Sequence, residues 1–103
     1  MIDIHQTERE TARWITLQAL WHGGGIFVSE RVLLRTLESV PLHVSAHELR
    51  AVIQYLAGHG LVEVNEDHHG QLSAKITPSG TDCVEYNAAC PEGIARPKKY
   101  WRG

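Results

Sequence analysis

The spacing of apolar residues changes abruptly at residues 58–60 (Gly-His-Gly), and this change limits which folds the chain can adopt. Before it, apolar residues recur at the i, i+3, i+4, i+7 spacing of a helix: Leu49, Val52, Ile53 and Leu56. After it, apolar and polar residues alternate as in a half-buried strand, with Leu72, Ala74 and Ile76 as the apolar set. The turn-forming residues 67–70 separate this strand from an earlier one over 61–66. The pattern predicts a helix followed directly by a β-hairpin.

Two more helices are predicted ahead of this pattern. The first begins near Thr7, because Thr7 and Glu10 have the spacing of a capping box, and it ends at the glycines 23–25. The second follows Ser29, a favourable N-cap residue, and Pro41 stops it. Residues 26–28 between them are apolar and are expected to form a brief extended segment.

Caps also define the third helix and predict a fourth. Ser45 and Glu48 form a second capping box at the start of the third helix. Thr77 and Pro78 suit the N-cap and first position of a helix that is expected to reach about Ala89. The predicted order is α-α-α-β-β-α, a mainly α fold with a small β-hairpin, in the α+β class.

The length of 103 residues corresponds to one domain. We expect this domain to span 1–90 and to be followed by an extended or mobile tail over 91–103. The formal charge of −2 argues against a strongly basic coat protein of nucleic acids. The charge is divided unevenly, because 1–90 hold six basic and eleven acidic residues (−5), whereas the tail carries +3.

The sequence predicts a protein of the cytoplasm of a bacterial host, with no membrane partner. The first residues carry acid and have neither the basic nor the apolar region of a signal peptide. No apolar run reaches the ~18–20 residues that cross a bilayer. The two cysteines, Cys83 and Cys90, do not make a disulfide framework, so both are expected to be free thiols on one helix face.

The order of elements and two short strings resemble the winged helix-turn-helix domain of MarR-, PadR- and ArsR-type regulators. The string over 56–62 is similar to the step from recognition helix to wing, and the one over 76–80 is similar to the Leu-Thr-x-x-Gly junction after the wing. The helix-to-wing stretch and the tail over 91–97 also resemble small winged-helix proteins of Mu-like phages and prophages. These resemblances imply DNA binding and a role in phage or prophage gene control.

The resemblance places a recognition helix in the major groove of DNA, with its solvent face on the base edges. On the third helix this face offers His47, Arg50 and Gln54, and arginine and glutamine can read guanine and adenine by paired hydrogen bonds. The alternative is that these residues are an ordinary solvated helix face. The predicted wing adds three side chains for the backbone or minor groove: His68, His69 and Lys75.

The tail interleaves cations with aromatic residues. Its cations, Arg96, Lys98, Lys99 and Arg102, suit a phosphate backbone. Tyr100 and Trp101 could stack on bases or anchor a protein partner. A solvated tail without function is the third interpretation of the same residues.

Metal binding and catalysis are not predicted, and no cofactor is expected. The cysteines and the histidine pair 68–69 lack the spacing of zinc ligands. No nucleophile elbow, phosphate-binding loop or Glu-x-x-His motif occurs, so the chain is not expected to be an enzyme.

The leading hypothesis is a winged-helix protein that binds double-stranded DNA as a homodimer and regulates transcription. The alternative is a non-catalytic interaction module of the same fold that binds a phage or host protein and no DNA. Binding that strengthens as the pH falls toward about 6 would favour the first, because His47, His68 and His69 would then gain charge.

Overall fold

A computed structural model describes residues 3–98 of the chain. It contains four helices and a three-stranded antiparallel sheet, which makes it a small α+β domain. The elements in chain order are α1 (Ile4–His22), β1 (Val28–Ser29), α2 (Glu30–Glu38), α3 (Ala46–Gly58), β2 (Val62–Glu66), β3 (Leu72–Ile76) and α4 (Pro78–Val84). The predicted third helix and the hairpin are confirmed, and the brief extended segment at 26–28 corresponds to β1.

Strand β3 lies in the middle of the sheet, which has the order β1-β3-β2. Val28 pairs with Ala74 on one side, and Val64 pairs with Ala74 on the other. The alternation of β3 is confirmed, because Leu72, Ala74 and Ile76 are buried. In β2 only Val62 is buried, so most of this strand faces solvent.

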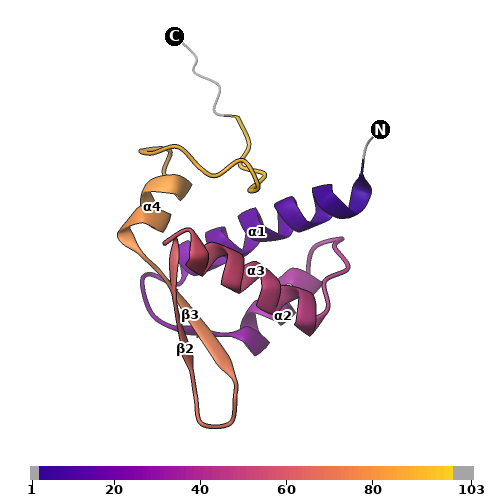
Figure 1. Cartoon of the computed structure of the whole chain (residues 1–103), viewed down its shortest axis with the longest axis vertical. Helices are drawn as coiled ribbons and strands as arrows, with labels where there is room; N and C mark the ends of the chain where they lie inside the picture. The colour runs from indigo at the N-terminus through magenta and orange to yellow at the C-terminus, as the bar shows by residue number, and fades with distance from the viewer. Residues whose placement is uncertain (1–2, 99–103) are drawn as a thin grey trace.

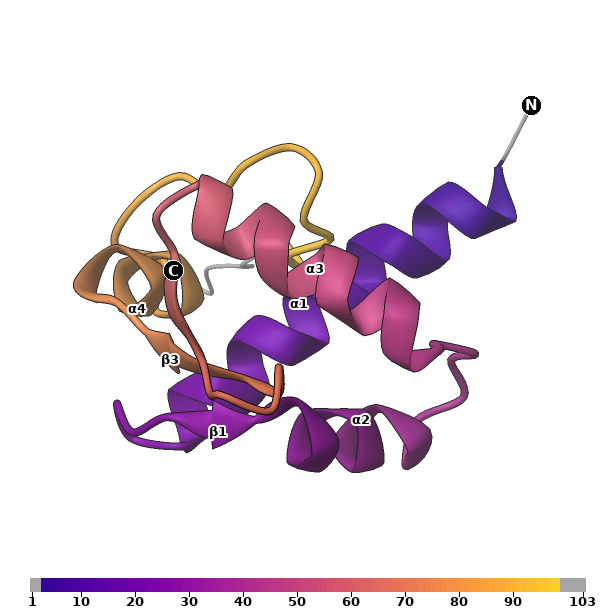
Figure 2. The ribbon, with the colours of Figure 1, turned by 60° about the horizontal axis from the view of Figure 1, so that its bottom comes forward.

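The core lies where α1, α2 and α3 pack on one another and on the inner side of the sheet. Its fully buried leucine and isoleucine side chains come from all three helices: Leu17, Leu20, Leu33, Leu37, Leu49, Ile53 and Leu56. In Figure 2, α2 and α3 lie on the same side of the hairpin, and α1 lies behind α3. The helices therefore support the base of the hairpin from one side.

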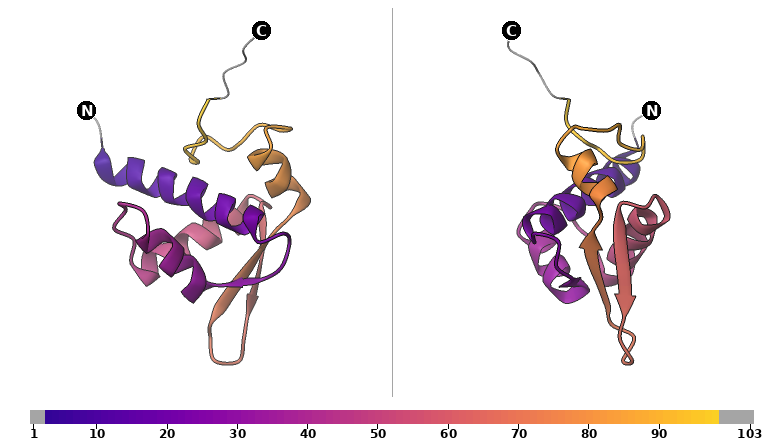
Figure 3. Two further views of the ribbon diagram at one scale, coloured as in Figure 1. Left: turned by 180° about the vertical axis from the view of Figure 1, so that it is seen from behind. Right: turned by 90° about the vertical axis from the view of Figure 1, so that its left-hand side faces the viewer.

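The hairpin of β2 and β3 projects from the helices, and its tip is at one end of the molecule (Figure 1). The segment that follows α4 lies at the other end, above α1, as the two views of Figure 3 also show. The tip and this segment are thus separated by the body of the domain.

Helix α3 begins with the predicted capping box. The Ser45 hydroxyl accepts from the Glu48 backbone N–H, and the Glu48 carboxylate accepts from the Ser45 N–H. These bonds lower the pKa of Glu48, with the backbone N–H of Ser45 as the largest cause. The predicted N-cap of α2 is also confirmed, since Ser29 accepts from the Val32 N–H.

The capping box predicted at Thr7 is wrong. Helix α1 begins one turn earlier, because the Asp3 carboxylate accepts from the backbone N–H groups of His5 and Gln6. The Thr7 hydroxyl lies within the helix and donates to the Asp3 carbonyl.

Helix α4 is shorter than predicted, and the expectation of free thiols is wrong. The helix ends at Val84 rather than near Ala89, and Tyr86 adopts a left-handed conformation with φ of 62°. The chain consequently turns back, which brings the Cα of Cys90 to 5.4 Å from that of Cys83. The two cysteines are joined in a disulfide. The interpretation of both as residues of one helix face failed because it assumed an uninterrupted helix.

Residues 91–98, which we call the clasp, have no helix or strand and pack on α1. Ile94 is only 5% exposed and belongs to the core. The Ala95 N–H donates to the Glu10 carbonyl (3.0 Å), and Arg13 donates to the Gly93 carbonyl (2.8 Å). Gly93 is required by this close approach, since a Cβ there would overlap the Tyr55 hydroxyl. The part of the predicted tail that the structure describes is therefore anchored to the body.

Candidate functional site

The solvent face of α3 presents part of the predicted site. His47 and Gln54 are exposed, and Ala51 lies between them on the same stripe of the helix. Because the capping box fixes the start of the helix and Leu49, Val52, Ile53 and Leu56 bury the opposite side, this stripe stays accessible.

Arg50, predicted to read a base, is bound within the molecule. Its Nε and one terminal nitrogen donate to the two carboxylate oxygens of Glu30 at 2.9 and 2.7 Å. The same terminal nitrogen donates to the Gly70 carbonyl at 2.6 Å. These bonds lower the pKa of Glu30 and raise that of Arg50. The guanidinium therefore links α3 to α2 and to the hairpin.

The hairpin carries the predicted histidines at its tip. His68 and His69 are exposed, and their ring centroids are 4.3 Å apart. The Asp67 carboxylate shapes the turn by accepting from the backbone N–H groups of His69 and Gln71. Gly70, with φ of 80°, supplies the left-handed residue of the turn.

Lys75 lies on the outer face of the sheet with partners on both sides. Its amine is 3.5 Å from the Glu63 carboxylate and 4.9 Å from the centroid of the Phe27 ring. Strand β2 and the turn add Glu66 and Asp67, both exposed. At neutral pH the hairpin surface therefore carries more negative than positive charge.

Arg96 has its partners at the end of α4 and in the loop that follows it. One terminal nitrogen donates to the carbonyls of Cys83 and Ala88, both at 2.9 Å, and the guanidinium lies 4.4 Å from the Tyr86 ring centroid. Lys98 is exposed at the end of the clasp. Four further predicted site residues lie outside the described residues: Lys99, Tyr100, Trp101 and Arg102.

The structure brings some of the predicted residues together and separates others. His47, Arg50 and Gln54 share α3, whose Arg50 reaches the hairpin turn next to His68 and His69. Arg96 and Lys98 belong to the clasp, at the opposite end of the molecule from the hairpin tip (Figures 1 and 3). Sequence reasoning had no signal for this separation, because it depends on the long-range contact of the clasp with α1.

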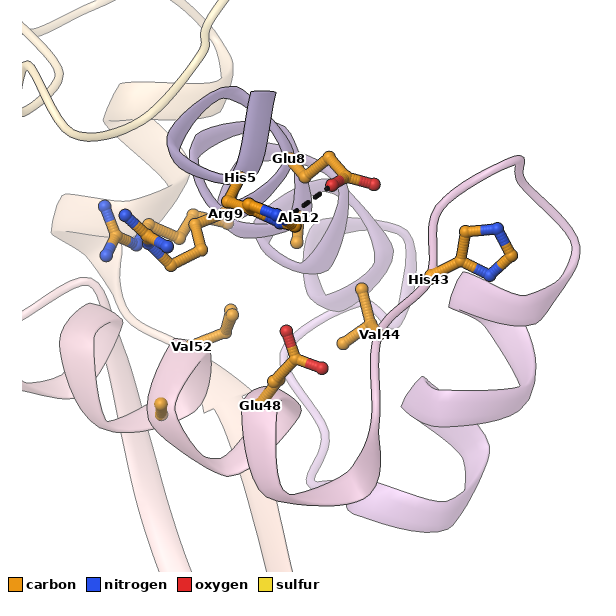
Figure 4. Close-up of a pocket in the computed structure, with 10 residues that line it drawn as sticks. His5, Glu8, Arg9, Ala12, His43, Val44, Glu48 and Val52 are labelled. Carbon is orange, nitrogen blue, oxygen red and sulfur yellow. Dashed lines mark ion pairs between the residues drawn. The ribbon is translucent and has the colours of Figure 1, made fainter. Parts of the chain in front are cut away.

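A cleft of about 390 Å³, which the sequence did not predict, lies between α1 and the start of α3. Figure 4 shows Glu48 and Val52 of α3 below His5 and Arg9 of α1, with the His5–Glu8 pair marked. Its wall also contains Arg13, whose guanidinium is 3.8 Å from the Tyr55 ring centroid. The lining mixes both signs of charge around a small apolar floor.

Neither a metal site nor a membrane span is found in residues 3–98. No three His, Cys, Asp or Glu side chains of this part of the chain are grouped as a metal ion requires. None of its helices is long and apolar enough to cross a bilayer. Comparisons with protein-family models, curated proteins and solved structures find no match to this chain.

Proposed function

We propose that this protein is a winged-helix domain that binds double-stranded DNA and regulates transcription in a phage or prophage. Support for the fold comes from the element order, from the short 39–45 connection between α2 and α3, and from the β1-β3-β2 sheet whose hairpin follows α3. A helix-turn-helix followed by a projecting hairpin is the arrangement that this fold uses to dock on DNA.

One observation carries the DNA proposal: an accessible helix stripe lies beside a projecting hairpin. His47 and Gln54 would lie in the major groove, with Gln54 able to pair with adenine. His68 and His69 would meet the adjacent backbone or minor groove. A homodimer would present two such helices to a two-part site.

The proposed interface gains cations from histidine rather than from arginine or lysine. At neutral pH its acidic side chains, Glu63, Glu66 and Asp67, oppose phosphate. Histidine gains a proton as the pH falls toward about 6. We therefore expect affinity for a 30-base-pair duplex to rise at least tenfold from pH 7.5 to pH 6.0 at 50 mM salt, measured by fluorescence anisotropy.

Matched variants test the assignment of the contacts. His47→Ala and Gln54→Ala each remove a proposed contact, while His22→Ala and Gln6→Ala remove the same side chains from exposed positions of α1. We expect a loss of about tenfold or more from each of the first pair, in the range of a good base contact. Equal effects of both pairs would contradict the assignment.

The intramolecular contacts of the basic side chains favour a second function. Arg50, Lys75 and Arg96 are engaged within the molecule, and the hairpin surface is acidic. An interaction module of the same fold would bind a basic surface of a phage or host protein there. This function would be supported over the first if the protein bound no duplex at 50 mM salt and pH 6.0. The Glu63→Lys variant should then also bind no duplex under the same conditions.

A further inference from the structure

The contacts of Glu30 join three elements close to the turn of the hairpin. Glu30 is the first residue of α2, and its carboxylate binds Arg50 of α3 through both oxygens. One of these oxygens also accepts from the Leu72 backbone N–H at 3.2 Å. Arg50 in turn binds the Gly70 carbonyl. We call this set of contacts the latch.

The latch continues the sheet beyond the end of β1. Ser29 is paired with Ser73, so an extended residue 30 would stand opposite Leu72. The chain instead becomes helical at Glu30. The Glu30 carboxylate accepts the N–H of Leu72, and a side chain thereby takes the place of the backbone acceptor that β1 no longer supplies.

The hairpin has few other contacts near its tip. All of β2 beyond Val62 is exposed, and so are residues 67–69. Leu72 is the buried residue of β3 nearest the turn. The orientation of the tip relative to α3 consequently depends on the bonds at Gly70 and Leu72, both of which belong to the latch.

We infer that Glu30 and Arg50 are positioning residues that hold the hairpin at a fixed orientation to α3. This inference rests on the proposed function, in which α3 and the hairpin tip must reach DNA together. It assigns Arg50 a role through the hairpin rather than a contact with a base or phosphate. If Arg50 left the latch to bind phosphate, the Glu30 carboxylate would remain near the DNA without its cation.

Amide hydrogen exchange tests the latch without DNA. In Glu30→Gln and in Arg50→Lys, we expect the Leu72 amide to exchange at least tenfold faster than in the unmodified protein at pH 7. The Ile53 amide, in the middle of α3, is the internal reference and is expected to keep its rate. Arg50→Lys retains the charge but loses the paired geometry, so an unchanged Leu72 rate in both variants would overturn the inference.

The salt dependence of DNA affinity separates positioning from contact. A residue that neutralises one phosphate contributes about 0.9 to the slope of log affinity against log salt. We expect Arg50→Gln and Glu30→Gln both to weaken binding at least threefold with the slope unchanged. A slope reduced by about 0.9 in Arg50→Gln alone would overturn the positioning role. If the unmodified protein binds no DNA, the proposed function fails, and the exchange rates still decide the latch.

Discussion

Arg50 and Arg96 lie in two regions that bind a guanidinium through intramolecular contacts of different kinds. Arg50, in the latch, has a carboxylate partner at 2.7 Å. Arg96, in the clasp, is bound by the Cys83 and Ala88 carbonyls and by the ring of Tyr86. An ion pair responds to pH through its acid, whereas carbonyls and a ring have no proton to gain in this range. The same residue type therefore makes one region sensitive to acid and the other insensitive.

The apolar surroundings of the two regions differ as well. The clasp places Ile94 in the core and shields one side of α1. The latch stands near the turn of a hairpin that is largely exposed. We expect the clasp to govern the free energy of unfolding and the latch to govern the shape of the surface that we propose faces DNA.

Ile94→Ala should have the largest effect on stability. Removing a buried isoleucine side chain costs about 2–4 kcal/mol, because it loses burial and leaves a cavity. Urea unfolding followed by circular dichroism measures the loss. Lys98→Ala, at an exposed position of the same clasp, is the control and should change stability by less than about 0.5 kcal/mol. Equal effects of the two substitutions would show that the clasp does not contribute to the core.

Loss of the Cys83–Cys90 disulfide should rank second. The bridge spans seven positions, and closing so short a loop stabilises a fold by about 2–3 kcal/mol in the chain-entropy description. Urea unfolding with and without a dithiol reductant measures this loss. Cys90→Ser should reproduce it and abolish the effect of the reductant. An unaltered unfolding midpoint after complete reduction, verified by mass, would contradict the prediction.

Arg96→Gln should reduce stability by about 1 kcal/mol, as expected for a partly exposed charged donor to carbonyls. Because the backbone carbonyls of Cys83 and Ala88 do not titrate, the difference from the unmodified protein should be the same at pH 7 and pH 3.5. Urea unfolding at the two pH values tests the prediction. A difference that disappeared at pH 3.5 would indicate a carboxylate partner instead.

Glu30→Gln should have the smallest effect on stability. Unlike the effect of Arg96→Gln, this effect should depend on pH. The pKa of Glu30 lies below its ordinary value of 4.5, first because of the hydrogen bond from Arg50. A lowered folded-state pKa adds stability above the unfolded pKa, and this contribution is lost as the pH falls through the folded value. Thermal unfolding should show a deficit of a few degrees at pH 7 that becomes smaller as the pH is lowered toward 3. A deficit of the same size at pH 3 would show that the contribution of Glu30, like that of Arg96, does not depend on pH.

Local patterns predicted α3, the hairpin and three of the N-caps (Ser29, Ser45 and Thr77) because each depends on residues a few positions apart. Ser45 and Glu48 lie three apart, and both bonds between them form as expected. The Asp3 cap was missed because Thr7 offered an equally good pattern one turn later. The local sequence pattern could not distinguish an N-cap at Asp3 from one at Thr7.

The partners of the arginines could not be predicted, since they are distant in sequence. Glu30 precedes Arg50 by 20 positions, and no pattern connects them. A signal did exist at the clasp, where Ile94 follows Gly93 and is the one large apolar residue between Pro91 and Pro97. The left-handed conformation of Tyr86 ends α4 and makes the disulfide possible, yet it has no glycine or asparagine to mark it.

The bond between Arg13 and Gly93 joins residues 80 positions apart. During synthesis, all four helices and the hairpin are made before Gly93, the residue whose carbonyl accepts from Arg13 of α1. Until Gly93 leaves the exit tunnel, the Arg13 guanidinium lacks this acceptor and the site for Ile94 stays open to water. The nascent domain therefore passes through an interval in which its secondary structure can be complete while one side of its core remains available to chaperones.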